Sequence, residues 1–230
     1  MKIEKNFRDL KASIKEVCEK TGRDPDDIKI IAVSKTFPIS NILELSQLGQ
    51  LDFGENRVRE LRDKYYNISF QHDIKINWHM VGHLQSRKVK DIIAFISLIH
   101  SVDTLELAEE IDRNAKKINH KKEILIQVNT SGEPQKSGIE PTETGTLCDQ
   151  VSQLENVKIK GLMTMARLTE NKDEIRQSFR MLKGIYDELK TVYTDFEYLS
   201  MGMTNDYEIA VEEGSNMLRI GSAIFGERTV

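Results

Sequence analysis

Hydrophobic positions along the chain follow two different spacings. Residues 3–20 carry apolar side chains at every third or fourth position and end at Thr21-Gly22-Arg23, which predicts an amphipathic opening helix closed by a glycine. Residues 28–33 then read Ile-Lys-Ile-Ile-Ala-Val. This β-branched, nearly continuous run predicts a strand that is buried on both faces of a parallel sheet.

The strand-then-helix unit recurs to the end of the chain. Further apolar runs that predict strands lie at 51–54, 76–81, 98–102, 124–128, 159–163, 198–201 and 217–220. Helical patterns between them lie at 40–48, 57–65, 87–94, 104–118, 142–154, 173–192 and 207–213. Because strict alternation implies parallel strands with right-handed crossovers, we expect an α/β fold, a (β/α)₈ TIM-type barrel with an extra N-terminal helix.

These units use almost the whole chain, so residues 1–230 are expected to form a single domain. The structural rival is an open, doubly wound sheet that binds a dinucleotide. Its main sequence support is missing, because the turn after the first strand, residues 34–38, has no Gly-x-Gly-x-x-Gly.

Composition narrows the class of protein. Hydrophobic residues make up 39% and charged residues 30%, which is typical of a folded globular chain. A net charge of -4 gives no reason to expect nucleic acid or a membrane as partner. Cys18 and Cys148 form no Cys-x-x-Cys pair, and the N-terminus lacks the apolar core of a secretory signal. We therefore expect a cytoplasmic protein and a monomer, with the basic run 116–122 on a solvated face.

Candidate chemistry lies just after the predicted strands, since reactive groups of such barrels gather at the carboxyl ends of the strands. Lys35 follows the first strand. Desolvation and neighbouring cations there would make its amine nucleophilic toward aldehydes, although a lysine at this point is often only a strand end that reaches for solvent.

Two turns near the end of the chain are rich in small and hydroxyl-bearing residues. Gly221 and Ser222 follow the last strand, and Ser200-Met201-Gly202-Met203-Thr204 follows the one before. Together they predict a phosphate cradle, although each glycine alone is more often a turn residue. Arg219 lies beside them and, once buried, needs a carboxylate or a ligand atom as its partner.

Other polar residues at strand ends leave two interpretations open. Glu55 or Asn56 can cap the following helix or meet a ligand. His79 and His83 have a spacing that suits a metal on a helix, but they lie in a strand and the turn after it, so no metal site is expected.

Several segments, in order along nearly the whole chain, resemble the pyridoxal phosphate homeostasis protein family. That family is similar in fold to the barrel domain of alanine racemase. The matching segments are Ile31–Thr36, Phe53–Asn56, Trp78–Gln85, Lys136–Gly138, Gly161–Thr164, Ser200–Met203 and Arg219–Gly226.

The resemblance implies that pyridoxal 5′-phosphate is the cofactor, bound to Lys35 as a Schiff base (an aldimine). It implies that Arg219 faces the pyridine nitrogen and that Asn56 lies near the polar edge of the ring. It places the phosphate on Ser200, Gly202, Gly221 and Ser222. One departure is the segment Thr204-Asn205-Asp206, where many relatives have Ser-Asp-Asp, so a hydroxyl is kept and a charge is lost.

The resemblance also implies a role in intracellular pyridoxal phosphate homeostasis. A permanent cation at the ring nitrogen weakens the electron sink that carbanion chemistry uses, and racemases need a second base from an additional domain. We therefore expect a carrier or regulator with no catalytic residue and no robust catalysis, and pyridoxal-phosphate-requiring apo-enzymes as candidate partners. A pyridoxal phosphate-dependent amino-acid racemase, a cofactor-free Schiff-base aldolase and a non-enzymatic phosphate sensor remain alternatives.

Overall fold

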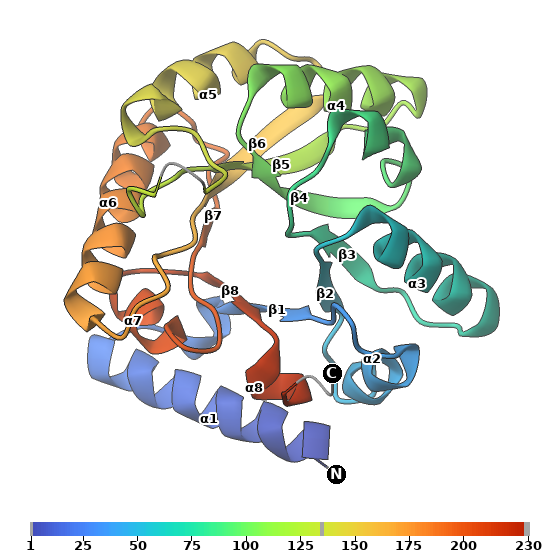
Figure 1. Ribbon diagram of the computed structural model, residues 1–230, viewed down its shortest axis with the longest axis vertical. Helices are drawn as coiled ribbons and strands as arrows, with labels where there is room; N and C mark the ends of the chain where they lie inside the picture. Colours follow the sequence, from blue (N-terminus) through green and yellow to red (C-terminus); the bar gives the residue numbers. More distant parts are fainter. Residues whose placement is uncertain (1, 134–135, 228–230) are drawn as a thin grey trace.

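Eight parallel strands close into a barrel in the computed structural model, which describes residues 2–133 and 136–227 (Figure 1). Each strand pairs with the next, and the last pairs with the first, for example at Ile31 and Arg219. The strands are β1 Lys29–Val33, β2 Asp52–Glu55, β3 Asn77–Met80, β4 Ile96–Val102, β5 Lys122–Gln127, β6 Val157–Met163, β7 Tyr198–Ser200 and β8 Met217–Ile220. The predicted barrel is confirmed.

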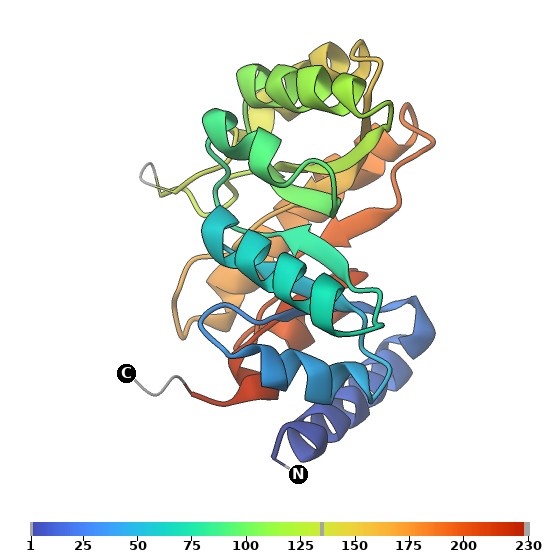
Figure 2. The ribbon, with the colours of Figure 1, turned by 90° about the vertical axis from the view of Figure 1, so that its right-hand side faces the viewer.

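Helices surround the barrel, and Figure 2 shows α4, α3 and α2 stacked along one side. Their bounds are α1 Lys2–Thr21, α2 Ile39–Ser46, α3 Val58–Gln71, α4 Leu105–Lys117, α5 Thr144–Ser152, α6 Lys172–Lys190, α7 Tyr207–Glu212 and α8 Ser222–Phe225. Three short 3₁₀ helices are η1 Pro25–Asp27, η2 Ser86–Asp91 and η3 Pro141–Glu143. Within the described residues, no helix is long and apolar enough to cross a bilayer.

The extra N-terminal helix is also confirmed. It runs along the lower edge of Figure 1 and packs against α2, α7 and α8. Gly22 ends it at φ 69°, a left-handed conformation that glycine adopts without a steric penalty. Arg23 then donates from Nη1 to the carbonyl oxygens of Val211 and Ser215, each at 2.7 Å. These bonds tie the start of the chain to the segment before β8.

The segment 87–94, predicted to be helical, departs from an α-helix. It contains the 3₁₀ helix η2, whose side chains three positions apart eclipse one another. Val89 is the buried residue of η2, and Ile92 and Ile93, which follow it, are buried as well. Three buried apolar residues thus lie within five positions of a short link between β3 and β4, which is why the spacing imitates an α-helical pattern.

Successive side chains along each strand point to opposite faces of the sheet, and this divides the core into two layers. Outward-facing residues pack under the helices, and inward-facing residues such as Ile31, Leu98 and Met217 form a separate cluster inside the barrel. The inward positions are not all apolar. Polar side chains occupy the same inner face at Asp52, His79, His100, Ser200 and Arg219.

The basic run 116–122 is only partly solvated. Lys116, Lys117 and Lys121 are exposed, but Lys122 is buried and donates from Nζ to the carbonyl oxygen of Ile96 at 3.2 Å. Burial lowers the pKa of Lys122 below its ordinary value. The expectation was wrong at this residue because β5 begins there, two residues earlier than the apolar pattern that predicts the strand.

Candidate functional site

A cavity of about 1210 Å³ opens at the carboxyl ends of the strands, where the barrel fold places reactive groups. Five of the seven predicted site residues line it: Lys35, Asn56, Arg219, Gly221 and Ser222. The structure thus brings together residues in or just after β1, β2 and β8, which lie up to 187 positions apart in sequence. Ser200 and Gly202 do not line this cavity and lie behind its wall.

The turn that carries Lys35 is held in a defined conformation. Lys35 is half-buried and follows β1 by two residues. Thr36 has a left-handed φ of 71°, which is unfavourable for a residue with a Cβ atom. Its backbone N–H donates to Oε1 of Glu60 at 2.6 Å, and Phe37 N–H donates to the carbonyl oxygen of Ser34 at 3.0 Å. These bonds fix the direction in which the Lys35 side chain leaves the strand.

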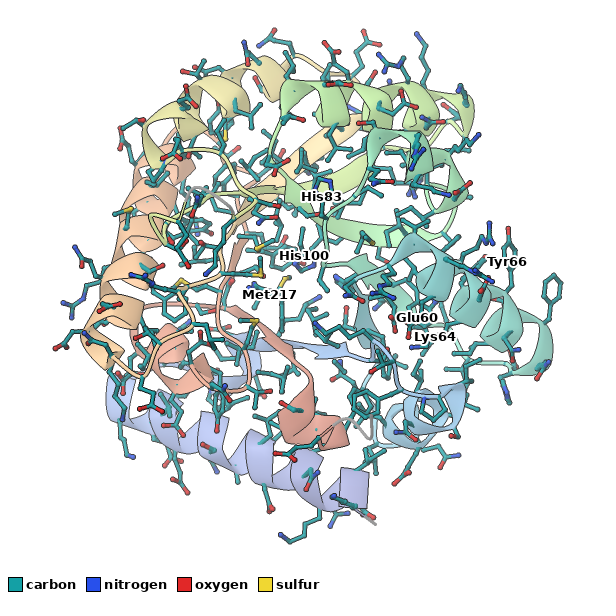
Figure 3. The ribbon with its side chains drawn as sticks, viewed as in Figure 1. Glu60, Lys64, Tyr66, His83, His100 and Met217 are labelled. Carbon is teal, nitrogen blue, oxygen red and sulfur yellow. The ribbon has the colours of Figure 1, made fainter. Side chains whose placement is uncertain are left out.

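Lys64 of α3, labelled next to Glu60 in Figure 3, anchors the same turn. Its Nζ donates to the carbonyl oxygen of Ser34 at 2.7 Å, to Oε1 of Glu55 at 2.7 Å and to Oε1 of Glu60 at 2.8 Å. Ser34 Oγ also donates to Oε1 of Glu55 at 2.7 Å. Burial raises the pKa of the Glu55 carboxyl, and the adjacent Lys64 ammonium opposes that rise. Glu55 is therefore part of a buried ion pair and neither caps a helix nor lines the cavity.

Sequence reasoning missed this ion pair, although a signal was present. Lys64 lies three residues after Leu61 and four before Ile68, and both of those are buried on the inner face of α3. A lysine on an apolar helix face needs buried acceptors, and Glu60 lies one turn away at i−4. The spacing alone does not tell which strand supplies the second carboxylate.

Asn56 lines the cavity and does not cap α3, whose N-cap residue is Arg57. Gly82 packs directly against its backbone. A Cβ atom on Gly82 would lie 2.4 Å from the carbonyl oxygen of Asn56 and 2.7 Å from its Cα. The turn after β3 therefore needs a glycine so that the turn after β2 can keep its place.

Arg219 is buried, and its side chain reaches the cavity from β8. Nη1 donates to Ser200 Oγ and Nη2 to the carbonyl oxygen of Thr164, both at 2.7 Å. Burial lowers the pKa of Arg219 to about 10, so the guanidinium stays charged at neutral pH. Both acceptors are neutral oxygens, so these two bonds supply no carboxylate, and the other expected partner, a ligand atom, stays a prediction.

The two closing turns are joined to each other. Ala223 N–H, in α8, donates to Thr204 Oγ1 at 3.2 Å, so the hydroxyl kept at this position links the turn after β7 to the turn after β8. Gly202 has φ 97°, and a Cβ atom there would lie 2.6 Å from Ala210 Cβ. Packing beneath the turn therefore requires a glycine at position 202. A role of Gly202 in phosphate binding stays a prediction.

One wall of the cavity comes from a loop that the sequence did not single out. The segment between β6 and α6 contributes Met165 to Thr169, and Arg167 and Lys172 bring positive charge to it. Met165 lies two residues after β6, but Arg167 to Thr169 lie four or more residues beyond it, so inspection of strand ends does not find them. The cavity therefore extends past the predicted cofactor residues.

Comparison with known proteins places the chain in a family. The model of the alanine racemase N-terminal domain matches residues 6–229. The pyridoxal phosphate homeostasis protein of Aquifex aeolicus is 41% identical over 216 residues, which cover 94% of this chain and 93% of that protein. The chain belongs to the pyridoxal phosphate homeostasis protein family.

Solved structures agree with this assignment. PipY of Synechococcus elongatus, solved with pyridoxal phosphate bound, superposes with a TM-score of 0.80 at 33% identity and covers 93% of this chain and 100% of that one. Alanine racemase of Clostridium difficile superposes with a TM-score of 0.78 at 18% identity, over 100% of this chain and 57% of that one. The second likeness shows the barrel fold alone.

His79 and His83 face different parts of the molecule, and the absence of a metal site between them stays a prediction. His83 lies at the cavity, whereas His79 is buried in the barrel and contacts Asp52 and His100 at 3.0 Å each. The described part of the chain contains no group of three side chains suited to hold a metal ion.

Both buried histidines predict a loss of stability in acid. Burial lowers the pKa of His79 below 6.5 and that of His100 well below it. Near and below that value the unfolded chain binds more protons than the folded one, so the free energy of unfolding falls as the pH falls, by about 1.4 kcal/mol per pH unit for each proton. The charged groups that face the pair are Asp52, Glu123, Lys29 and Arg219.

Urea denaturation at a series of pH values measures this effect, with His100→Gln as the comparison. The slope of unfolding free energy against pH should become shallower in the variant, because one proton-binding group has been removed. An equal slope in both proteins would show that His100 titrates alike in the folded and unfolded states.

Proposed function

We propose that this chain binds pyridoxal 5′-phosphate covalently on Lys35 and serves the intracellular supply of that cofactor. The observation that carries the proposal is the meeting of an amine, a buried cation and a small-residue turn in one cavity: Lys35, Arg219 and Gly221-Ser222. The bound cofactor in PipY, a relative with 33% identity over 93% of this chain, supports it.

The chemistry of these groups fits the cofactor. Pyridoxal phosphate supplies an aldehyde that condenses with a primary amine, with one water released as the C=N bond forms. Lys35 supplies the amine. Gly221 lets the backbone approach an anion closely, and Ser222 adds a hydroxyl for the phosphate. In this proposal Arg219 donates to the pyridine nitrogen, and Asn56 meets the polar edge of the ring.

Arg219 also favours a holding role over turnover. A guanidinium has no proton to give up at neutral pH, so it donates a hydrogen bond to the ring nitrogen without protonating it. Carbanion chemistry depends on the protonated ring as an electron sink. We therefore propose a carrier or regulator without robust catalysis, in a single domain. Delivery to apo-enzymes and the monomeric state stay predictions.

The cytoplasm is the compartment we propose. Cys18 and Cys148 are both buried free thiols, and burial raises the pKa of Cys148 to about 12. Thiols of this kind are typical of proteins from a reducing compartment.

Replacing Lys35 with alanine tests the assignment. Protein loaded with pyridoxal phosphate should show a near-visible absorption band that borohydride abolishes while fixing the cofactor to the chain. Lys35→Ala should lose both the band and the fixed cofactor, and retain only weak, non-covalent binding at the Gly221-Ser222 turn. Lys172→Ala is the matched control, because Lys172 lines the same cavity and should be dispensable for the band.

A band that survives in Lys35→Ala would refute the assignment. Absence of any band in the unaltered protein, with an amine that still traps other aldehydes, would favour a cofactor-free aldolase. Rapid exchange of the α-proton of free amino acids by the loaded protein would instead support a racemase.

A further inference from the structure

Behind Arg219, a line of polar side chains crosses the interior of the barrel. Arg219 Nη1 lies 2.7 Å from Ser200 Oγ, and Ser200 Oγ lies 3.4 Å from His100 Nδ1. His100 Nε2 lies 3.0 Å from His79 Nδ1, and His79 Nε2 lies 3.0 Å from Asp52 Oδ1. Figure 3 shows His100 near the middle of the barrel. We call Asp52, His79, His100 and Ser200 the barrel relay.

The two ends of this line fix the direction of every hydrogen bond in it. A guanidinium only donates, so Ser200 Oγ accepts from Arg219. An ionised carboxylate only accepts, so His79 Nε2 carries the proton that is donated to Asp52. Burial raises the pKa of Asp52, but the hydrogen bond from His79, the nearby Lys29 ammonium and the hydrogen bond from Asn77 oppose that rise, and the net pKa is lowered. The carboxylate end of the line is therefore ionised.

The middle of the line then has one consistent assignment. Burial keeps His79 and His100 neutral, so each ring has one N–H and one bare nitrogen. With its proton on Nε2, His79 accepts at Nδ1 from His100 Nε2–H, and His100 accepts at Nδ1 from the Ser200 hydroxyl. Every polar atom of the line has a partner of the correct kind, and all donors point from Arg219 toward Asp52.

We propose that the barrel relay positions the guanidinium of Arg219 at the cavity wall. Its four members come from β2, β3, β4 and β7, so the placement of one side chain depends on half of the strands. The relay residues touch no ligand in this account and are positioning residues. Their effect on pyridoxal phosphate rests on the proposed function, whereas the direction of the bonds does not.

The relay gives Ser200 a role that differs from the sequence-based expectation. Its hydroxyl proton is directed to His100, and its oxygen accepts from Arg219. The side chain is fully buried and does not line the cavity. Ser200 thus acts on the ligand through Arg219, and the side chain that would contact a phosphate is that of Ser222, at the start of α8.

Nitrogen-15 NMR of the histidine rings tests the relay in protein free of cofactor. Long-range proton–nitrogen correlation distinguishes a protonated from a bare ring nitrogen. At neutral pH, both His79 and His100 should carry the proton on Nε2 and have a bare Nδ1. Protonation of either ring at Nδ1, or a cationic ring, would overturn the proposal, because the single direction of donors would be lost.

Ser200→Ala and Ser222→Ala form a matched pair that separates positioning from phosphate binding. Ser200→Ala should shift the His100 Nδ1 and Arg219 side-chain signals in the cofactor-free protein. It should also weaken pyridoxal phosphate binding about tenfold, as expected for the loss of a buried hydrogen bond to a charged group. Ser222→Ala should weaken binding by a similar factor and leave both NMR signals in place.

Each outcome of this pair bears on one claim. If Ser200→Ala leaves the His100 and Arg219 signals unchanged and only weakens binding, as Ser222→Ala does, then Ser200 is a direct phosphate ligand and the relay is wrong. If the NMR assignments hold but no cofactor becomes attached to Lys35, the relay stands and the proposed function fails.

Discussion

Lys64→Met should lower the free energy of unfolding by about 3–5 kcal/mol, the cost of leaving a buried charge without its partner. Lys64 is 6% exposed and neutralises Glu55, which is fully buried. Methionine fills similar space but donates nothing, so Glu55 Oε1 keeps only the Ser34 hydroxyl. The Ser34 carbonyl oxygen and Glu60 lose a donor as well, so the turn that carries Lys35 loosens, and retention of pyridoxal phosphate should fall. Urea denaturation and the near-visible band measure the two effects.

Two variants control this experiment. Lys183→Met removes an exposed i,i+4 pair with Asp187 and should cost less than about 0.5 kcal/mol. The double variant Lys64→Met with Glu55→Leu removes the whole buried pair and should recover most of the lost stability, since apolar replacements of buried ion pairs are often neutral. A double variant as unstable as Lys64→Met alone would mean that Glu55 is not the partner left unpaired.

Gly82→Ala should cost about 3 kcal/mol, the upper part of the usual range for overpacking, and should weaken cofactor binding. The added Cβ would lie 2.4 Å from the carbonyl oxygen of Asn56, a backbone atom that moves only if the whole turn after β2 moves. Asn56 would then leave its place at the cavity. Thermal or urea unfolding gives the first effect, and titration with pyridoxal phosphate gives the second.

Gly184→Ala is the matched control for this substitution. Gly184 lies in the middle of α6, and nothing lies within 4 Å of a Cβ atom built there. Alanine is favoured over glycine in a helix interior by up to about 1 kcal/mol, so this variant should be slightly more stable, with unchanged cofactor binding. If Gly82→Ala behaved like Gly184→Ala, the close packing of the two turns would be refuted.

The fold could be predicted because each strand and helix carries its own periodic signal. The alternation of apolar runs with helical spacing gave all eight strands in order. The segment 87–94 was the weakest point, since its buried residues are Val89 of the 3₁₀ helix η2 and Ile92 and Ile93 after it, at a spacing that an α-helix also shows. The four-residue helix α8 follows Gly221 too closely to show any period of its own.

The sequence could predict only those site residues that are recognised by their position at the end of a strand. Lys35, Asn56 and Arg219 lie at or near strand ends, and the barrel topology brings them to one cavity. Partnerships inside the barrel depend on distance between strands, which no single segment records. His100 and Ser200 lie 100 positions apart. Lys64 and Glu55 lie only nine positions apart, but on a helix and a strand whose packing the sequence does not record. For the same reason, the engagement of Ser200 with Arg219 was not foreseen.

The attachment point of the cofactor is the central claim, and peptide mapping by mass spectrometry tests it most directly. Protein loaded with pyridoxal phosphate is reduced with borohydride, digested and sequenced by fragmentation. The account predicts that the cofactor mass lies on Lys35 and on no other lysine of the cavity. A fully loaded protein with the added mass on Lys172, and an unmodified Lys35, would contradict it.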